Sequence, residues 1–120
     1  MSISILIVDD HRSYAKSLAL ALTGFGFNTS YAINPEGAFS LVSKQKFDVL
    51  IIDFDMPEVK GDEMAQKLDE IQIIDQKILI SGFDLRKANE DYKFDMVMSK
   101  PLDMYILEEM LNELNRIKKS

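Results

Sequence analysis

The fold is decided by residues 47–61, FDVLIIDFDMPEVKG. Four consecutive apolar residues, Val49–Ile52, end abruptly at Asp53, and a loop leads from there to Gly61. A continuous apolar run of this length is too short for a typical helix, and it suits a strand that is covered on both faces of a sheet. We therefore expect a central strand with Asp53 at its carboxyl end, which is the edge where open α/β sheets bind ligands.

The rest of the chain alternates between strand and helix patterns. Strand patterns lie at residues 3–8, 27–32, 77–80 and 95–99. Helix patterns lie at residues 12–23, after Asn34 as N-cap, from Gly61, at residues 83–92 where a short helix is expected, and after Asp103 as N-cap. Strict alternation implies a parallel sheet with right-handed crossovers and helices on both faces. The predicted fold class is α/β, with five strands and five helices in one domain over residues 1–120.

Two of the expected helices have continuous apolar faces. The face of the helix after Gly61 comprises Met64, Ala65, Leu68 and Ile71. The face of the last helix comprises Leu107, Met110, Leu111, Leu114 and Ile117. Because apolar residues at this spacing share one side of a helix, we expect both faces to pack against the sheet.

Composition argues against several functional classes. The net charge is −6, whereas nucleic-acid binding demands clustered Lys and Arg, so we expect no nucleic-acid partner for this domain. No apolar stretch approaches the roughly 20 residues of a membrane span, and residues 1–10 lack the features of a secretory signal. We therefore expect a cytoplasmic protein without a membrane partner. The absence of cysteine excludes disulfides and thiolate chemistry.

Polar residues able to do chemistry follow four of the five expected strands: Asp9 with Asp10, Asp53, Ser81 and Lys100. Neighbouring strands lie about 4.8 Å apart, so the carboxylates can converge on one ion if the first and third strands are adjacent. The candidate ligands are hard oxygens, which favours Mg²⁺ or Mn²⁺ over zinc. A phosphoryl group fits the remaining residues, because Lys100 would neutralise one of its oxygens, Ser81 would donate to another, and Asp53 would be the nucleophile.

These motifs resemble the CheY-like receiver domain of bacterial two-component response regulators. The matching segments are ILIVDDH with Asp9 and Asp10, LIIDFDMP with Asp53 and the downstream Gly61, ILISG with Ser81, and SKP with Lys100 and Pro101. All motifs occur in the family's order, and the resemblance covers nearly the whole chain. It implies a flavodoxin-like, doubly wound fold with strand order 2-1-3-4-5.

The resemblance also implies a role for each residue. Asp53 would accept a phosphoryl group from the phosphohistidine of a histidine kinase or a histidine phosphotransfer protein. Ser81 would move toward the phosphoryl group and Lys100 would pair with it, which would alter a surface for a downstream protein or output domain. The peptide bond before Pro101 would be cis.

A metal site with four ligands is implied as well. Asp10 would bind Mg²⁺ directly and Asp9 mainly through water, with the carboxylate of Asp53 and the backbone carbonyl of Asp55 as the other protein ligands. Asp55 also lies two residues after the acceptor, where the family tunes the lifetime of the phosphoryl group.

Two features depart from the family's pattern. Receivers commonly carry an aromatic residue three positions before the lysine, and here that residue is Val97. The separation from Ser81 to Lys100 is also a few residues shorter than usual. Both departures concern the coupling between phosphorylation and the face formed by the fourth helix, the fifth strand and the fifth helix.

Other interpretations remain open. Asp9 and Asp10 alone would be typical of helix capping, and His11 beside them is expected to be a surface residue and not a ligand. LIIDFDMP also resembles the nucleophile motif of small haloacid dehalogenase-type phosphohydrolases, although that motif normally opens the chain. A receiver can also dock constitutively, without phosphorylation. We expect a switch that catalyses only its own phosphorylation and dephosphorylation, and not an enzyme that acts on metabolites.

Overall fold

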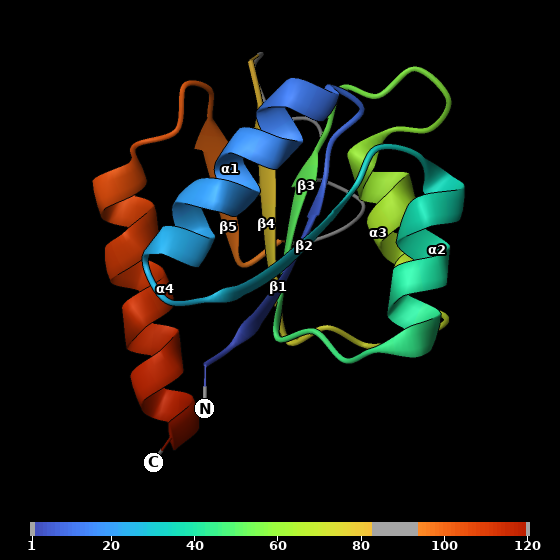
Figure 1. Cartoon of the computed structure of the whole chain (residues 1–120). Coiled ribbons are helices and arrows are strands. Elements are labelled where there is room, and N and C mark those ends of the chain that lie inside the picture. The colour runs from blue at the N-terminus through green and yellow to red at the C-terminus, as the bar shows by residue number, and fades with distance from the viewer. Residues whose placement is uncertain (1, 83–93, 120) are drawn as a thin grey trace.

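The computed structural model describes residues 2–82 and 94–119, which form a five-stranded sheet with helices on both sides (Figure 1). The strands are β1 (Ser4–Val8), β2 (Asn28–Ala32), β3 (Val49–Asp53), β4 (Gln76–Ser81) and β5 (Met96–Ser99). The helices are α1 (Arg12–Gly24), α2 (Pro35–Lys44), α3 (Gly61–Asp69) and α4 (Met104–Lys119). No helix within these ranges has the length and apolar character needed to cross a membrane. The predicted α/β class is confirmed.

All five strands are parallel, in the order β2-β1-β3-β4-β5. This confirms the expected order 2-1-3-4-5. The strand β3 lies between β1 and β4, with Val8 opposite Ile52 and Asp53 opposite Ile80. Because the strands are parallel and their carboxyl ends are nearly level, the residues that end or follow β1, β3, β4 and β5 gather along one edge of the sheet.

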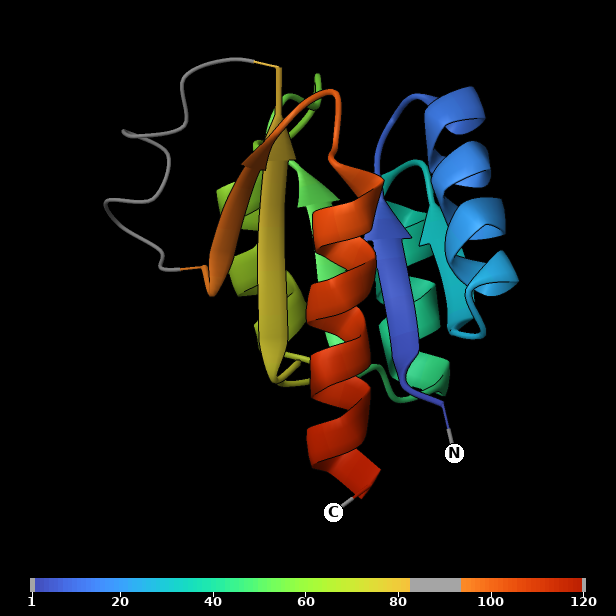
Figure 2. The same cartoon turned by 90° about the vertical axis from the view of Figure 1, so that its left-hand side faces the viewer.

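Helices α1 and α4 cover one face of the sheet, and α2 and α3 cover the other (Figures 1 and 2). All five residues of β3 are buried. Val49 and Ile51 belong to the core beneath α1 and α4, whereas Leu50 and Ile52 belong to the core beneath α2 and α3. Burial of one such side chain contributes about 1.5–3 kcal/mol. The apolar run of β3 is therefore continuous because this strand supplies both cores.

Side-chain caps explain where two of the helices begin. Asn34 accepts a hydrogen bond at Oδ1 from the N–H of Gly37, at 2.8 Å, in front of α2. Asp103 accepts two at Oδ1, from the N–H groups of Tyr105 and Ile106, both at 3.1 Å, in front of α4. These bonds satisfy N–H groups that have no partner within the helix. Both predicted N-caps are confirmed.

The structure differs from the sequence-based expectation in its helices. The described ranges contain four helices and not five, and the short helix expected at residues 83–92 lies outside them. Ile71 is 47% exposed because α3 ends at Asp69, two residues earlier. Ile117 is 62% exposed, because the last turns of α4 extend beyond the edge of the sheet (Figure 2). The other residues of the two predicted apolar faces are buried or half-buried.

Candidate functional site

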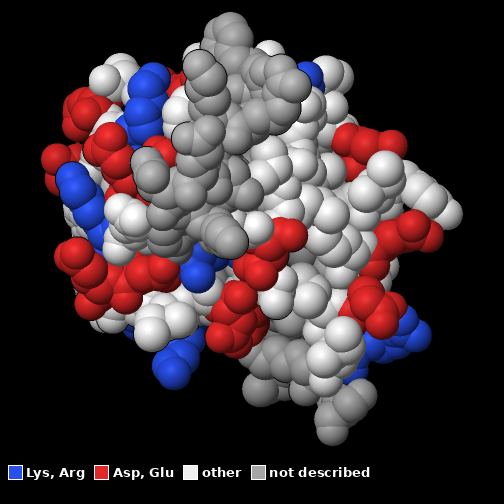
Figure 3. Space-filling view, turned by 180° about the vertical axis from the view of Figure 1, so that it is seen from behind, with Lys and Arg blue, Asp and Glu red and all other residues white. Residues whose placement is uncertain are grey.

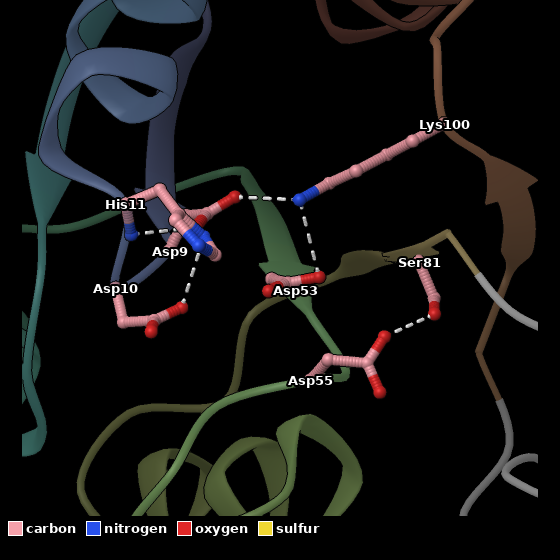
Figure 4. A network of polar contacts seen from close by, with 7 residues as sticks. All are labelled: Asp9, Asp10, His11, Asp53, Asp55, Ser81 and Lys100. Atoms are coloured by element: carbon pink, nitrogen blue, oxygen red, sulfur yellow. Dashed lines mark hydrogen bonds and ion pairs between the residues drawn. The ribbon is translucent and has the colours of Figure 1, made fainter.

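The strand ends bring the predicted side chains together at one edge of the sheet (Figure 4). Asp53 is the last residue of β3, and Ser81 is the last residue of β4. Asp9 follows β1, and its N–H donates to the carbonyl of Ala32 at 3.1 Å. Lys100 follows β5, and its N–H donates to the carbonyl of Ser81 at 2.8 Å. The backbone hydrogen bonds of the sheet thus extend to Asp9 and Lys100 and fix the positions from which their side chains project.

Three carboxylates form an acidic cluster at this edge. One oxygen each of Asp9, Asp10 and Asp53 and one ring nitrogen of His11 all lie within 4.8 Å of one another. Asp9 and Asp53 are buried, and the side chain of Asp10 is 26% exposed. The Oδ1 atoms of Asp10 and Asp53 are buried and accept no hydrogen bond from the residues that the structure describes. Carboxylates this close repel one another, so the donor set suits a hard divalent cation such as Mg²⁺ or Mn²⁺.

Lys100 lies between two of these acids. Its Nζ is 3.1 Å from Oδ2 of Asp9 and 3.4 Å from Oδ1 of Asp53. Burial lowers the pKa of Lys100, but the hydrogen bond and charge of Asp9, together with Asp53, raise it by more, so the net pKa lies above the usual value. The ammonium group therefore stays charged and compensates part of the buried negative charge. The Lys100–Pro101 peptide bond is cis, as the family resemblance implies.

The charge of Asp53 is only partly compensated. The pKa of Asp53 is raised from 3.8 to about 6, chiefly by burial and further by the neighbouring charge of Asp9. Lys100 and a backbone hydrogen bond from Asp55 act in the opposite direction. A divalent cation beside Asp53 would stabilise its ionised form.

The hydroxyl group of Ser81 points toward Asp55 (Figure 4). Ser81 is fully buried, and its Oγ donates a hydrogen bond to Oδ2 of Asp55. The carboxylate of Asp55 therefore faces β4 and is not a member of the acidic cluster. The backbone carbonyl of Asp55 as a metal ligand stays a prediction.

Gly61 allows the chain to pack closely against the end of β3. A Cβ atom at this position would lie 2.3 Å from the carbonyl oxygen of Asp53 and 2.9 Å from Cα of Phe54. The N–H of Gly61 also donates to the carbonyl of Phe54 at 3.0 Å. The loop after Asp53 thus folds back onto the strand end because residue 61 has no side chain.

Two further side chains reach the site, one from the residue just before α1 and one from its first turn. His11 is 69% exposed, as expected for a surface residue, but its Nδ1 lies 3.3 Å from Asp9 and 3.4 Å from Asp10. Sequence reasoning missed Tyr14, whose ring centre is 4.5 Å from Nζ of Lys100. No local pattern marks Tyr14, because α1 begins only at Arg12 and the contact joins this helix to a residue near the other end of the chain.

The fold and the place of the site define a class of protein. The chain is a flavodoxin-like, doubly wound α/β protein, and its polar site lies at the carboxyl ends of β1 and β3, where the strand order reverses. The sequence model of the response regulator receiver domain family matches residues 5–112. The chain therefore belongs to that family, which serves two-component signalling.

Individual relatives agree with this assignment. The chain is 32% identical to the sensor protein EvgS of Escherichia coli O157:H7, over 96% of this chain and 10% of EvgS. It is 28% identical to the response regulator receiver protein CpdR of Brucella abortus (strain 2308), over 94% of each. The solved structure of the response regulator protein TrrA from Thermotoga maritima, in complex with Mg(2+)-BeF, is 25% identical with a TM-score of 0.80, over 95% of this chain and 99% of that one.

The relatives differ in length. The chain spans about a tenth of EvgS and nearly the whole of CpdR. None of these matches favours the haloacid dehalogenase alternative.

Proposed function

We propose that this receiver is a phosphorylation switch in which Asp53 accepts a phosphoryl group from a phosphohistidine. The observation that carries the proposal is the placement of Asp53. Its buried carboxylate has an oxygen without a hydrogen bond from the described residues, the ammonium of Lys100 lies 3.4 Å away, and the carboxylates of Asp9 and Asp10 lie beside it.

Mg²⁺ is the proposed cofactor, with Mn²⁺ as a substitute. Asp10 and Asp53 would hold it directly, Asp9 mainly through water, and the backbone carbonyl of Asp55 would complete the protein ligands. The buried Oδ1 atoms of Asp10 and Asp53, which accept no hydrogen bond from the described residues, fit this assignment, and the related TrrA was solved with Mg(2+)-BeF. When bound, the cation would neutralise charge on the carboxylate and on the incoming phosphoryl group.

The residues of the chain would then carry out the transfer. A carboxylate oxygen of Asp53 attacks phosphorus and forms a P–O bond while the P–N bond of the phosphohistidine breaks, and the imidazole nitrogen keeps the electron pair. Lys100 exchanges its contact with Asp53 for a phosphoryl oxygen. The Oγ of Ser81 leaves Asp55 and donates to another phosphoryl oxygen. Later attack of water on phosphorus releases phosphate and restores Asp53, so the chain is a self-acting switch and not a turnover enzyme.

The proposed partners follow from this chemistry. A histidine kinase or a histidine phosphotransfer protein would supply the phosphoryl group, and a downstream protein or output domain would respond. On the face shown in Figure 3, the visible Lys and Arg side chains lie scattered among acidic ones. Three expectations stay predictions: that no nucleic acid binds this domain, that it has no membrane partner, and that it is cytoplasmic. The net charge of −6 supports the first of them, because nucleic acid is itself negatively charged.

The test is intact-protein mass spectrometry after incubation with Mg²⁺ and acetyl phosphate or phosphoramidate. We expect a labile gain of one phosphoryl group in the wild type and in Asp62→Asn, a matched control in the first turn of α3, and no gain in Asp53→Asn. EDTA should abolish the gain. If the wild type gains nothing from these donors and nothing from a phosphorylated histidine kinase, the proposal is wrong and a docking domain without phosphorylation becomes the better reading.

A further inference from the structure

The side chain of Lys100 has an aromatic neighbour that none of the motifs includes. Tyr14 lies in the first turn of α1, is partly buried, and places its ring centre 4.5 Å from Nζ of Lys100. We propose that Tyr14 is a positioning residue, which holds the ammonium group of Lys100 over Asp53 by a cation–π contact. This inference rests on the proposed function, because it assigns a role in phosphoryl transfer to a residue outside the known motifs.

Lys100 needs such a contact because it reaches far across the sheet. It follows β5, whereas Asp9 follows β1, and both β3 and β4 lie between these two strands. The lysine stem is nevertheless long enough to bring Nζ to 3.1 Å from Asp9, and the side chain is extended (Figure 4). A flexible four-carbon stem loses rotamer freedom when it is held extended. Contacts at its far end must offset that loss.

The ring supplies a contact that the carboxylates cannot. Asp9 attracts Nζ toward β1 and Asp53 attracts it toward β3. A phosphoryl group on Asp53 would change the relative strength of these two attractions. The ring of Tyr14 attracts the ammonium through its π face but offers no anionic oxygen, so it does not compete with a phosphoryl oxygen. The contact can therefore persist while Lys100 exchanges one oxygen partner for another.

The surroundings of Tyr14 keep its ring in the neutral form. Burial raises the pKa of the Tyr14 hydroxyl, and the charges of Asp9 and Asp53 raise it further against the opposing effect of Lys100. The phenol therefore stays protonated near neutral pH. The ring is then available as a neutral π face, which a phenylalanine would also provide.

The strand β5 carries no aromatic residue, which makes the contact between Tyr14 and Lys100 more important. Val97 occupies the position where receivers commonly carry an aromatic side chain, and it is 38% exposed. Within residues 2–82 and 94–119, the aromatic ring found over the lysine comes from α1. This geometry links Lys100 to α1 through Tyr14.

The experiment compares Tyr14→Phe, which keeps the ring, with Tyr14→Leu, which removes it. Tyr105→Leu is the matched control, because Tyr105 is 70% exposed on α4. The first readout is the NMR shift of the ε-methylene protons of Lys100, assigned by its loss in Lys100→Met. Protons above an aromatic face are shifted upfield, so the shift should be present in the wild type, Tyr14→Phe and Tyr105→Leu, and absent in Tyr14→Leu.

The second readout is the rate at which acetyl phosphate with Mg²⁺ phosphorylates each variant. Loss of a cation–π contact corresponds to about a two- to thirtyfold slower reaction in Tyr14→Leu. Tyr14→Phe should match the wild type, and Tyr14→Met replaces Tyr14→Leu if the latter does not fold. An unchanged lysine shift or an unchanged rate in Tyr14→Leu overturns the inference, and so does a Tyr14→Phe variant as slow as Tyr14→Leu. If the wild type is not phosphorylated at all, the proposed function fails, while the lysine shift still decides whether the ring holds Lys100.

Discussion

Replacing Gly61 with alanine should both destabilise the fold and slow phosphorylation of Asp53. The added Cβ would lie 2.3 Å from the carbonyl oxygen of Asp53 and 2.9 Å from Cα of Phe54, and both are backbone atoms that no rotamer change can move aside. Relief of the closest contact requires a backbone shift of about 1 Å in a close-packed region. Overpacking of this kind costs about 2–3 kcal/mol in the free energy of unfolding.

The assay is urea unfolding, with Gly24→Ala as the matched control. A Cβ at Gly24, the last residue of α1, meets no heavy atom within 4 Å, so this variant should lie within about 0.5 kcal/mol of the wild type. With a slope of about 1.5 kcal/mol per molar urea, the unfolding midpoint of Gly61→Ala should fall by about 1.5–2 M.

The functional half of this prediction uses the same variants. A shift of about 1 Å at the acceptor can reduce the rate by up to about a hundredfold, so Gly61→Ala should gain the phosphoryl group far more slowly than Gly24→Ala. A Gly61→Ala variant with wild-type stability and wild-type rate would contradict this prediction, because it would show that the loop does not lie where the contact distances place it.

Three further predictions concern the charges of the site. The raised pKa of Asp53 means that the folded state holds its proton more tightly than the unfolded chain, so this residue makes the fold less stable as pH rises from about 4 through about 6. Without metal, Asp53→Asn should therefore be more stable than the wild type by about 2–3 kcal/mol at pH 7.5, and urea unfolding in EDTA should show this gap closing near pH 4; a gap independent of pH contradicts the shift. Asp55→Ala removes the acceptor that holds the hydroxyl of Ser81, so phosphorylation by acetyl phosphate should become severalfold faster. The free energy of one hydrogen bond to a charged group sets the upper limit of this gain. A slower reaction would mean that this contact assists the transfer. Lys100→Met removes the cation between Asp9 and Asp53, so Mg²⁺ should bind about tenfold more tightly by calorimetry while phosphorylation slows, and weaker Mg²⁺ binding would contradict the proposed metal site.

The caps and strand ends were predictable because their signals are local. Asn34 and Asp103 cap helices through N–H groups two or three residues away, so the relevant pattern fits within one short window. The convergence of Asp53 with Asp9 needed two further premises: that parallel strands end at the same edge, and that the first and third strands are neighbours, which the family resemblance implied. The same local reasoning failed at Ile71 and Ile117, because apolar spacing does not reveal where a helix ends or how far it extends past the sheet.

Contacts between distant segments could not be predicted in this way. The Oγ of Ser81 meets Asp55 across 26 residues, and Nζ of Lys100 meets Asp9 across 91. The clash that reserves position 61 for glycine likewise depends on the path of a loop, and the contact of Tyr14 with Lys100 depends on how α1 packs beside the strand ends.

The fold class and the set of polar residues at the strand ends follow from the amino-acid sequence, because burial patterns and caps depend on residues close in the chain. The strand order follows from the family resemblance. Which of those polar groups touch one another depends on the packed three-dimensional structure. Hydrogen bonds and charge contacts act over a few ångströms, and strand register together with helix packing sets such distances between segments far apart in sequence.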